Sequence, residues 1–196
     1  MASSSTDPTP VKTVQLEGKI IAITGANRGI YNSTSNITQY KFTNTTPGIG
    51  LGIADCCLSN GAKAIYSIDI GDTGDEFAGL SNKFPNQLFA LQADVTKEDS
   101  IQAAIDKILE QAGALHGMVC NAGRTKHKAA LDFTTEEIDQ LWGVNLYGSF
   151  YSARCAARAF IKQGVKGSIV FTASMASYRP NKVNSPTSST YVARLM

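Results

Sequence analysis

The sequence has few of the features that mark membrane, exported or nucleic-acid-binding proteins. It contains no run of 18 apolar residues, so no membrane span is expected. Its N-terminus lacks the apolar core of a signal peptide. Lysine and arginine are scattered without a dense run, and the net charge is only +2, which argues against a nucleic-acid partner. These absences predict a cytoplasmic protein with neither a membrane nor a nucleic acid as partner.

Cysteine is also scarce, and its spacing argues against a metal site. None of Cys56, Cys57, Cys120 and Cys155 forms a CxxC pair, and two adjacent cysteines are poorly placed to share a metal. We therefore expect no metal and four buried free thiols. Residues 1–15 are rich in Ser, Thr and Pro and are expected to form a disordered lead-in.

The rest of the chain alternates short apolar runs with amphipathic stretches. Strands are expected at 19–24, 61–69, 87–94, 117–121 and 167–173. Helices are expected at 49–58, 96–112 and 134–162, the second capped by Thr96 and the third near Thr134. This alternation predicts an α/β fold over residues 16–178, with a doubly wound parallel sheet between two layers of helices.

A glycine-rich turn follows the first predicted strand, but a polar stretch at residues 30–48 interrupts it. Gly25 and Gly29 stand before this stretch, and Gly48 and Gly50 stand at its end. Backbone N–H groups of such a turn, with the N-terminus of the next helix, can hold the negative charge of a pyrophosphate. Removing residues 30–48 rejoins the two halves without loss of a motif residue, so we interpret this stretch as an inserted loop.

Two charged residues bear on which dinucleotide this turn would bind. Asp69 closes the second predicted strand, where an acid can bind the ribose hydroxyls of NAD. Arg28 favours the opposite choice, because a cation near the ribose tolerates the 2′-phosphate of NADP. Both cofactors remain open at this point.

Five motifs in order resemble the short-chain dehydrogenase/reductase family. They are TGANRG…GIG at the glycine turn, ADV at 93–95, CNAG at 120–123, GVNLYGSF at 143–150 and SIVFTASMAS at 168–177. Within the family, IVFTASMASYRPNK is similar to fungal polyol and ketose reductases of the sorbose and mannitol type. The resemblance implies a Rossmann-fold oxidoreductase, commonly a homo-oligomer, that moves hydride between NAD or NADP and a small alcohol or carbonyl.

The resemblance also assigns roles to individual residues. The cofactor would contact Gly25, Asn27, Arg28, Gly29, Ile49, Gly50, Asp69, Asp94, Val95, Asn121, Ala122 and Gly123. Among these, Asp94 would touch the adenine ring. Asn145 would anchor a proton-relay water at a helix kink, and Ser174 would bind the substrate oxygen. Taken singly, Asn121 is also compatible with a turn, Asn145 with a bond to its own helix, and Ser174 with an ordinary hydroxyl at a strand end.

The family's central pair is a tyrosine followed four residues later by a lysine, on one helix face. The lysine cation lowers the tyrosine pKa from about 10, so that the phenol can act as acid or base. Tyr178 and Lys182 have this spacing, but they come too soon after the fifth strand, and Pro180 between them opposes a helix. Tyr191 lies at a plausible distance, but Leu195 stands where the lysine should be. We therefore expect impaired turnover.

The insertion 30–48 and the tail 179–196 invite a common explanation. We hypothesise that both derive from intron sequence read as protein; a natural loop combined with a short isoform is the alternative. We expect a disordered bulge at 30–47, a helix beginning near Gly48 and weakened cofactor binding. By resemblance, the last strands and part of the dimer face would be missing, so the fifth strand would be an exposed edge. A non-catalytic nucleotide-binding module and a non-functional product remain alternatives to an enzyme.

Overall fold

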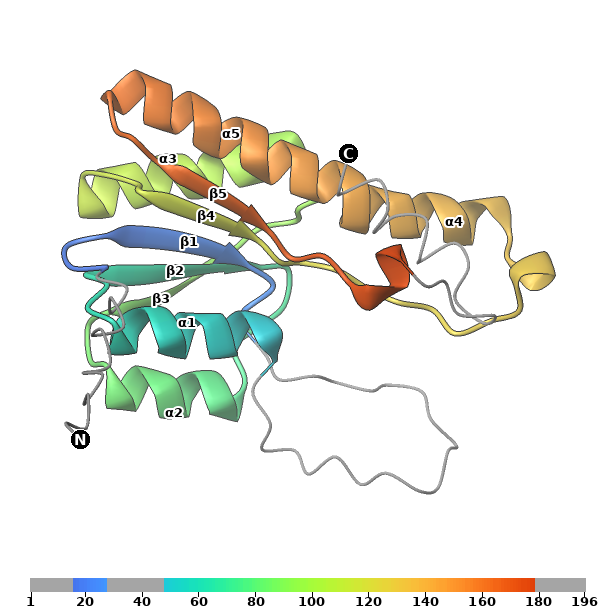
Figure 1. Ribbon diagram of the computed structural model, residues 1–196, viewed down its shortest axis with the longest axis horizontal. Helices are drawn as coiled ribbons and strands as arrows, with labels where there is room; N and C mark the ends of the chain where they lie inside the picture. Colours follow the sequence, from blue (N-terminus) through green and yellow to red (C-terminus); the bar gives the residue numbers. More distant parts are fainter. Residues whose placement is uncertain (1–15, 28–47, 179–196) are drawn as a thin grey trace, which may run out of the picture.

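The computed structural model describes residues 16–27 and 48–178, which form a parallel five-stranded sheet with helices on both faces (Figure 1). The strands are β1 (Ile20–Thr24), β2 (Ala64–Asp69), β3 (Leu88–Gln92), β4 (Gly117–Cys120) and β5 (Ser168–Phe171). The helices are α1 (Ile49–Ser59), α2 (Asp75–Lys83), α3 (Glu98–Ala112), α4 (Thr135–Trp142) and α5 (Gly148–Gln163), with shorter turns η1 (Ala130–Asp132), η2 (Gly143–Tyr147) and η3 (Met175–Ser177). The predicted α/β/α fold is confirmed. The predicted lead-in at 1–15, bulge at 30–47 and tail at 179–196 lie outside the described residues.

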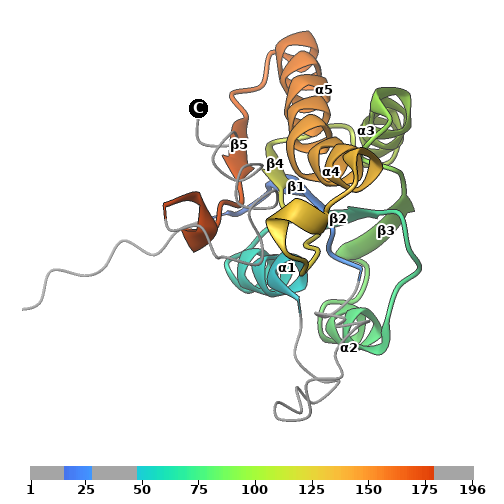
Figure 2. The ribbon, with the colours of Figure 1, turned by 90° about the vertical axis from the view of Figure 1, so that its right-hand side faces the viewer.

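The sheet separates two apolar layers, as Figure 2 shows from the end of the strands. Helices α1 and α2 cover one face, and α3 and α5 cover the other. Alternate residues of β1 point to the two layers: Ile20 and Ala22 join the α3–α5 side, whereas Ile21 and Ile23 join the α1–α2 side. Because all of β1 is buried, its sequence is a continuous apolar run rather than an alternating one.

The strand order β3-β2-β1-β4-β5 places β1 beside β4 at the centre of the sheet. The chain winds outward from β1 through β2 and β3, then returns to the other side for β4 and β5. In open α/β sheets, ligands bind outside the carboxyl ends of the strands at this reversal. The outer strand β5 pairs only with β4 among the described residues, and Val170 and Phe171 are exposed there, as expected for an edge.

Helix α2 lies between β2 and β3, where the sequence analysis expects no helix. Its only two buried anchors are Phe77 and Leu80, which pack on the α1–α2 side of the sheet. The helix begins after Gly74 and carries Asp75 and Glu76 in its first turn, which suits the positive end of the helix dipole. The surrounding Gly and Asp residues are typical of a loop, and two buried apolar residues are too few to indicate a helix by their spacing.

The predicted cap of α3 is wrong. The helix begins at Glu98, and Lys97 occupies the cap position without a capping side chain. Thr96 instead donates both its backbone N–H and its hydroxyl to Asp94 Oδ1, at 3.0 and 2.7 Å. The Asp94 side chain thus closes a turn after β3, and this local bond takes Thr96 away from the helix.

The expectation of four buried thiols is also wrong in part. All four cysteines are free, and Cys120 and Cys155 are buried, but Cys57 is half-buried and Cys56 is exposed. Helix α1 presents Leu51, Ala54 and Leu58 to the sheet, which leaves Cys56 on the outer side.

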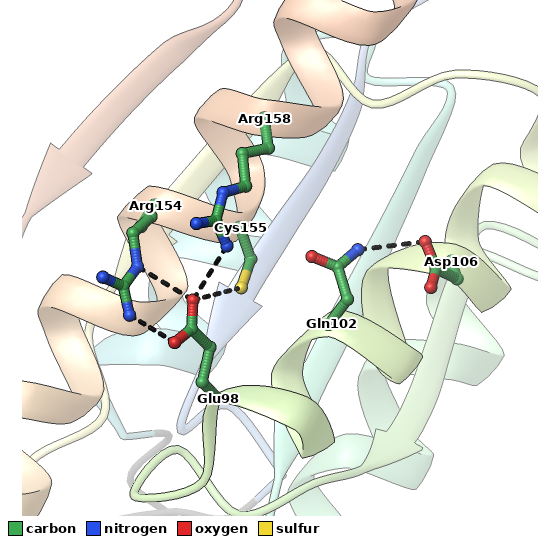
Figure 3. Close-up of polar contacts among 6 residues, drawn as sticks. All are labelled: Glu98, Gln102, Asp106, Arg154, Cys155 and Arg158. Carbon is green, nitrogen blue, oxygen red and sulfur yellow. Dashed lines mark hydrogen bonds and ion pairs between the residues drawn. The ribbon is translucent and has the colours of Figure 1, made fainter.

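An ion-pair cluster joins α3 to α5 on the other face of the sheet (Figure 3). Arg154 donates Nε and Nη2 hydrogen bonds to the two oxygens of Glu98, and Arg158 donates to Oε1 at 3.0 Å. The hydrogen bond from Arg154 is the main cause that lowers the pKa of Glu98 below its usual range. The Cys155 thiol lies 3.9 Å from the same carboxylate, and burial followed by this negative charge raises its pKa. The cluster fixes the start of α3 against the middle of α5.

Candidate cofactor and active site

The two halves of the interrupted glycine turn pack directly on each other. Gly25 has a φ of +72°, and a Cβ there would lie 2.9 Å from the Ala122 Cα. A Cβ on Gly50 would lie 2.6 Å from the Gly25 oxygen and 2.7 Å from Asn121 Nδ2. Only glycine fits either position without backbone movement. Arg28 and Gly29 lie outside the described residues.

The N-terminus of α1 has the properties of an anion site. The helix begins at Ile49, directly after Gly48, which confirms the predicted start. No side chain caps the helix, its first turn carries no acidic residue, and Ile49 is exposed. The N–H groups of such a turn, with the positive end of the dipole, suit a phosphate group. The residues present therefore fit the pyrophosphate of a dinucleotide.

Asn27 and Asp69 join the glycine turn to the end of β2. The buried Asn27 amide donates to the Gly71 oxygen at 2.7 Å and accepts from the Ser67 hydroxyl at 2.6 Å. The Asn27 backbone N–H donates to Asp69 Oδ2 at 3.2 Å, and the Gly71 N–H donates to Oδ1 at 3.1 Å. The Asp69 carboxylate is thus held at the carboxyl end of β2, where the sequence analysis places the ribose.

Asp94 and Val95 follow β3 and face different surroundings. Asp94 is partly exposed and is held by the turn bonds with Thr96, so its backbone position is fixed. Val95 is buried against α5: a Cβ on Gly148 would lie 2.8 Å from Val95 Cγ2. The small residue at 148 therefore allows the first turn of α5 to approach the loop after β3.

Asn121 connects the ends of three strands. Its Nδ2 donates to the Thr24 and Gly25 carbonyls at 3.0 and 3.2 Å, and its Oδ1 accepts from the Thr172 hydroxyl at 3.2 Å. The side chain thus bridges β1, β4 and the turn after β5. Thr24 completes this network, because its buried hydroxyl accepts the N–H groups of Asn121 and Ala122, each at 3.0 Å. Gly123, next in the chain, is exposed at this edge.

The role of Thr24 could not be recognised from the sequence. In the sequence Thr24 is only the polar residue at the end of an apolar strand. Nothing in the spacing of residues indicates the two N–H hydrogen bonds that its hydroxyl accepts.

The predicted long helix 134–162 is interrupted at the position of Asn145. Residues Gly143–Tyr147 form a π-turn, in which the Gly148 N–H bonds to the Gly143 oxygen. Asn145 is fully buried within this turn. Its Oδ1 accepts the Arg124 N–H at 2.8 Å, and its Nδ2 donates to the Arg124 oxygen at 3.0 Å. The side chain therefore holds the loop after β4.

Ser174 lies at the same edge of the sheet, close in the chain to Thr172. Its Oγ accepts the Ala176 N–H at 3.2 Å and caps η3, which leaves the hydroxyl hydrogen able to donate to a ligand. Tyr178 is exposed directly after η3. Tyr191, Lys182 and Leu195 lie outside the described residues.

A second set of residues that the sequence analysis misses follows Arg124. Lys126 and Lys128 donate to the two oxygens of Glu137, at 2.5 and 3.0 Å. Glu137 also closes a capping box with Thr134 at the start of α4. The hydrogen bonds from Lys126, then Lys128, then the Thr134 backbone lower the pKa of Glu137 to about 2. The role of Glu137 as a capping residue could have been recognised from the sequence, because Thr134 and Glu137 have the spacing of a capping box.

The sequence of the chain matches a model of the short chain dehydrogenase family over residues 42–193. That span covers most of the chain. The chain belongs to this family. The matched region starts within the predicted insertion and includes Tyr191. Among the residues that the structure describes, no helix is both long and apolar enough to cross a membrane.

Individual curated relatives are longer than the chain. It is 28% identical over 164 residues to 2-dehydro-3-deoxy-D-gluconate 5-dehydrogenase of Escherichia coli K12, covering 84% of this chain and 56% of the relative. It is 29% identical over 177 residues to L-2,3-butanediol dehydrogenase of Corynebacterium glutamicum, covering 89% and 61%. The chain thus spans a little over half of these curated relatives.

Solved structures of the family share the described fold. A short-chain type dehydrogenase/reductase from Mycobacterium marinum matches with a TM-score of 0.77 and 26% identity, over 92% of this chain and 66% of that one. A 3-ketoacyl-(acyl-carrier-protein) reductase from Brucella melitensis, complexed with NADH, matches with a TM-score of 0.73 and 26% identity, over 91% and 66%.

Proposed function

We propose that this protein binds NAD or NADP at the carboxyl edge of its sheet and serves hydride transfer to or from a small alcohol or carbonyl. The Asn121 network carries this proposal. One side chain joins the glycine turn to the ends of β4 and β5, so the predicted cofactor and substrate residues share one edge. The nicotinamide would supply or accept the hydride. The protein's own groups would bind, orient and move the proton.

The residues at this edge divide that work by their chemistry. The N–H groups at the start of α1 would hold the pyrophosphate, and Ser174 would donate its hydroxyl to the substrate oxygen. Asn145 would position the proton-relay water from the π-turn, because that turn departs from the regular helical bond pattern. Asp94 would contact the adenine ring from the turn after β3.

We further propose a preference for NAD over NADP. Asp69 is held by two backbone N–H groups at the end of β2, and its negative charge would repel a 2′-phosphate there. Fluorescence titration should show tighter binding of NADH than of NADPH. The Asp69→Asn variant should lessen that difference. Equal affinities in the unmodified chain would refute the preference.

We propose that turnover is weak because Leu195 occupies the lysine position beside Tyr191. A leucine carries no charge that would favour the tyrosinate form of Tyr191. The Leu195→Lys variant should raise NADH oxidation with a panel of polyols and ketoses, and adding Tyr191→Phe should abolish the gain. High turnover by the unmodified chain would contradict this account.

A non-catalytic nucleotide-binding module is the second candidate, favoured by the contact between Gly25 and Gly50 combined with Leu195. It predicts NADH binding in both the unmodified chain and the Leu195→Lys variant, with no hydride transfer in either. The two candidates therefore separate on the lysine variant, whereas absence of NADH binding would exclude both.

We propose that the predicted insertion, residues 30–48, weakens cofactor binding. It separates Asn27 from the start of α1 in the sequence, although Gly25 and Gly50 remain in contact. A variant that lacks residues 30–48 should bind NADH more tightly, and circular dichroism would control for its folding. Identical affinities would show that the contact between the two glycines is sufficient.

We also propose that the protein forms a homo-oligomer through α5. Tyr147, Phe150 and Ile161 are large exposed apolar residues on η2 and α5, which is the kind of surface that interfaces use. Light scattering after size exclusion should give a mass above that of one chain. The free cysteines fit a reducing compartment such as the cytoplasm.

A further inference from the structure

The segment after β4 holds three cations within five residues next to the proposed substrate site, a denser run than the scattered lysines and arginines expected from the sequence. It reads RTKHK from Arg124 to Lys128, and the next acidic residue in the chain is Asp132. The segment leaves the sheet beside the turn that carries Ser174, because Cys120 and Phe171 are paired in register and the Thr172 N–H bonds to the Cys120 oxygen. We call Arg124, Lys126 and Lys128 the basic rim.

The three cations of the basic rim differ in their surroundings. Lys126 and Lys128 share one carboxylate, that of Glu137, whose side chain is largely covered. Arg124 is exposed, and no carboxylate among the described residues pairs with its guanidinium. The rim therefore holds three positive groups against one paired carboxylate. Its excess charge includes the guanidinium of Arg124, the rim residue that follows β4 most closely in the chain.

The backbone of Arg124 is fixed while its side chain stays in solvent. Asn145 binds both the N–H and the carbonyl of Arg124 from the buried π-turn. A guanidinium on an anchored backbone loses little further freedom on binding, and its planar N–H groups match the two oxygens of a carboxylate or phosphate. Two features point to ligand recognition rather than to an ordinary solvated charge: the anchoring and the neighbouring Ser174 turn.

We propose that the basic rim recognises an oxyanion, a carboxylate or phosphate, on the carbonyl or alcohol substrate, and that Arg124 is the residue that binds it. This inference rests on the proposed function, because it places the substrate at the same edge of the sheet. It adds a substrate class: a small molecule with an anionic group some distance from its reacting carbon. Neutral polyols and ketones would bind more weakly.

Matched probe pairs test the proposal by binding, independently of turnover. Levulinate and its methyl ester form a carboxylate pair, and glyceraldehyde 3-phosphate and glyceraldehyde form a phosphate pair. Dissociation constants would be measured by NMR titration with and without NADH. The charged member of at least one pair should bind about tenfold more tightly in the unmodified chain. The preferred pair would then identify the oxyanion.

Two variants with opposite expected effects make the test specific. Arg124→Gln should reduce the charged-to-neutral preference to about threefold or less, whereas Glu137→Gln should increase it, because the latter frees two lysines. Glutamine at 137 preserves the capping-box pattern, so α4 should remain folded. Lys162→Gln, at the far end of α5, removes an exposed cation away from the rim and should leave the preference unchanged.

Three outcomes would overturn the proposal: no charge preference in either pair, an unchanged preference in Arg124→Gln, or a loss of NADH affinity in that variant. The last result would assign Arg124 to a phosphate of the cofactor. Failure of the proposed function is distinguishable, because it would appear as absent NADH binding in the unmodified chain. The anion preference would still be measured in the absence of NADH.

Discussion

Replacing Gly50 with alanine would test the contact that joins the two halves of the glycine turn. The new Cβ would lie 2.6 Å from the Gly25 oxygen, 2.7 Å from Asn121 Nδ2 and 3.0 Å from the Ala26 Cβ. One of these neighbours is a backbone carbonyl and another belongs to a bonded network, so neither can yield by a simple side-chain rotation. The start of α1 must therefore move away from β1.

The size of the effect follows from this crowding. Overpacking of a tight interior site costs about 1–3 kcal/mol. For a chain of this size, each kcal/mol lowers the melting temperature by about 2–4 °C, so Gly50→Ala should melt about 2–12 °C lower. The N–H groups that face the pyrophosphate would be displaced with the helix, and NADH affinity should fall at least about tenfold.

Gly52 provides a matched control in the same helix. A Cβ at this position would meet no heavy atom within 4 Å, and its φ is not in the left-handed region. Gly52→Ala should therefore raise stability by up to about 1 kcal/mol, because alanine favours the helix, and should leave NADH affinity unchanged. Thermal melts and fluorescence titrations of both variants would compare them. If Gly50→Ala is as stable as Gly52→Ala, the reasoning from the close contact is wrong.

Substitutions at three further residues test other contacts. Thr24→Val removes a buried hydroxyl that accepts two N–H groups and should lower the free energy of unfolding by about 1–3 kcal/mol in urea, whereas Thr24→Ser should not. Burial, then Lys19 and Lys63, lowers the pKa of His116 below 6.5, and its Nδ1 accepts a backbone N–H of β1. The unfolded chain therefore takes up the proton first, so stability present above pH 6.5 should be lost below it, and less so in His116→Gln. The pKa of Glu98 is lowered from 4.5, so its stabilisation is present above that pH and lost in stronger acid. Glu98→Gln should lower the melting temperature at pH 7, and the difference should shrink in high salt and vanish in strong acid.

The centre of the sheet could be predicted because β1, β2 and β4 are almost wholly buried. Strands β1 and β2 are mostly apolar, and the residues that end them, Thr24 and Asp69, lie at one edge by the parallel topology alone. Asn121 follows β4 and Ser174 follows β5, so the parallel arrangement of these strands places both residues at the same edge. Much of the candidate site thus follows from where strands end, before any side-chain contact is known.

The features that could not be predicted depend on hydrogen bonds rather than on apolar spacing. The π-turn at Gly143–Tyr147 inserts one residue into the bond pattern of a helix, and apolar periodicity does not register a change in backbone partners. Thr96 is a residue type that commonly caps helices, but its hydroxyl donates to Asp94 and does not accept an N–H group of the helix. Helix α2 buries only Phe77 and Leu80, and the sequence around them is typical of a loop, so apolar spacing gives little indication of a helix.

The Asn121 network also changes how an interruption of the glycine turn should be judged. From the sequence, the inserted loop between Gly25 and Gly50 is expected to weaken cofactor binding. In the structure the two glycines are positioned by β1, α1 and Asn121, all of which lie outside that loop. Loop length adds only a logarithmic entropy cost to bringing its ends together, and packing of α1 on the sheet already provides that closure. The geometry that faces the pyrophosphate is therefore a property of the sheet edge. The effect of residues 30–48 on cofactor affinity should depend on obstruction of that edge rather than on loss of its shape.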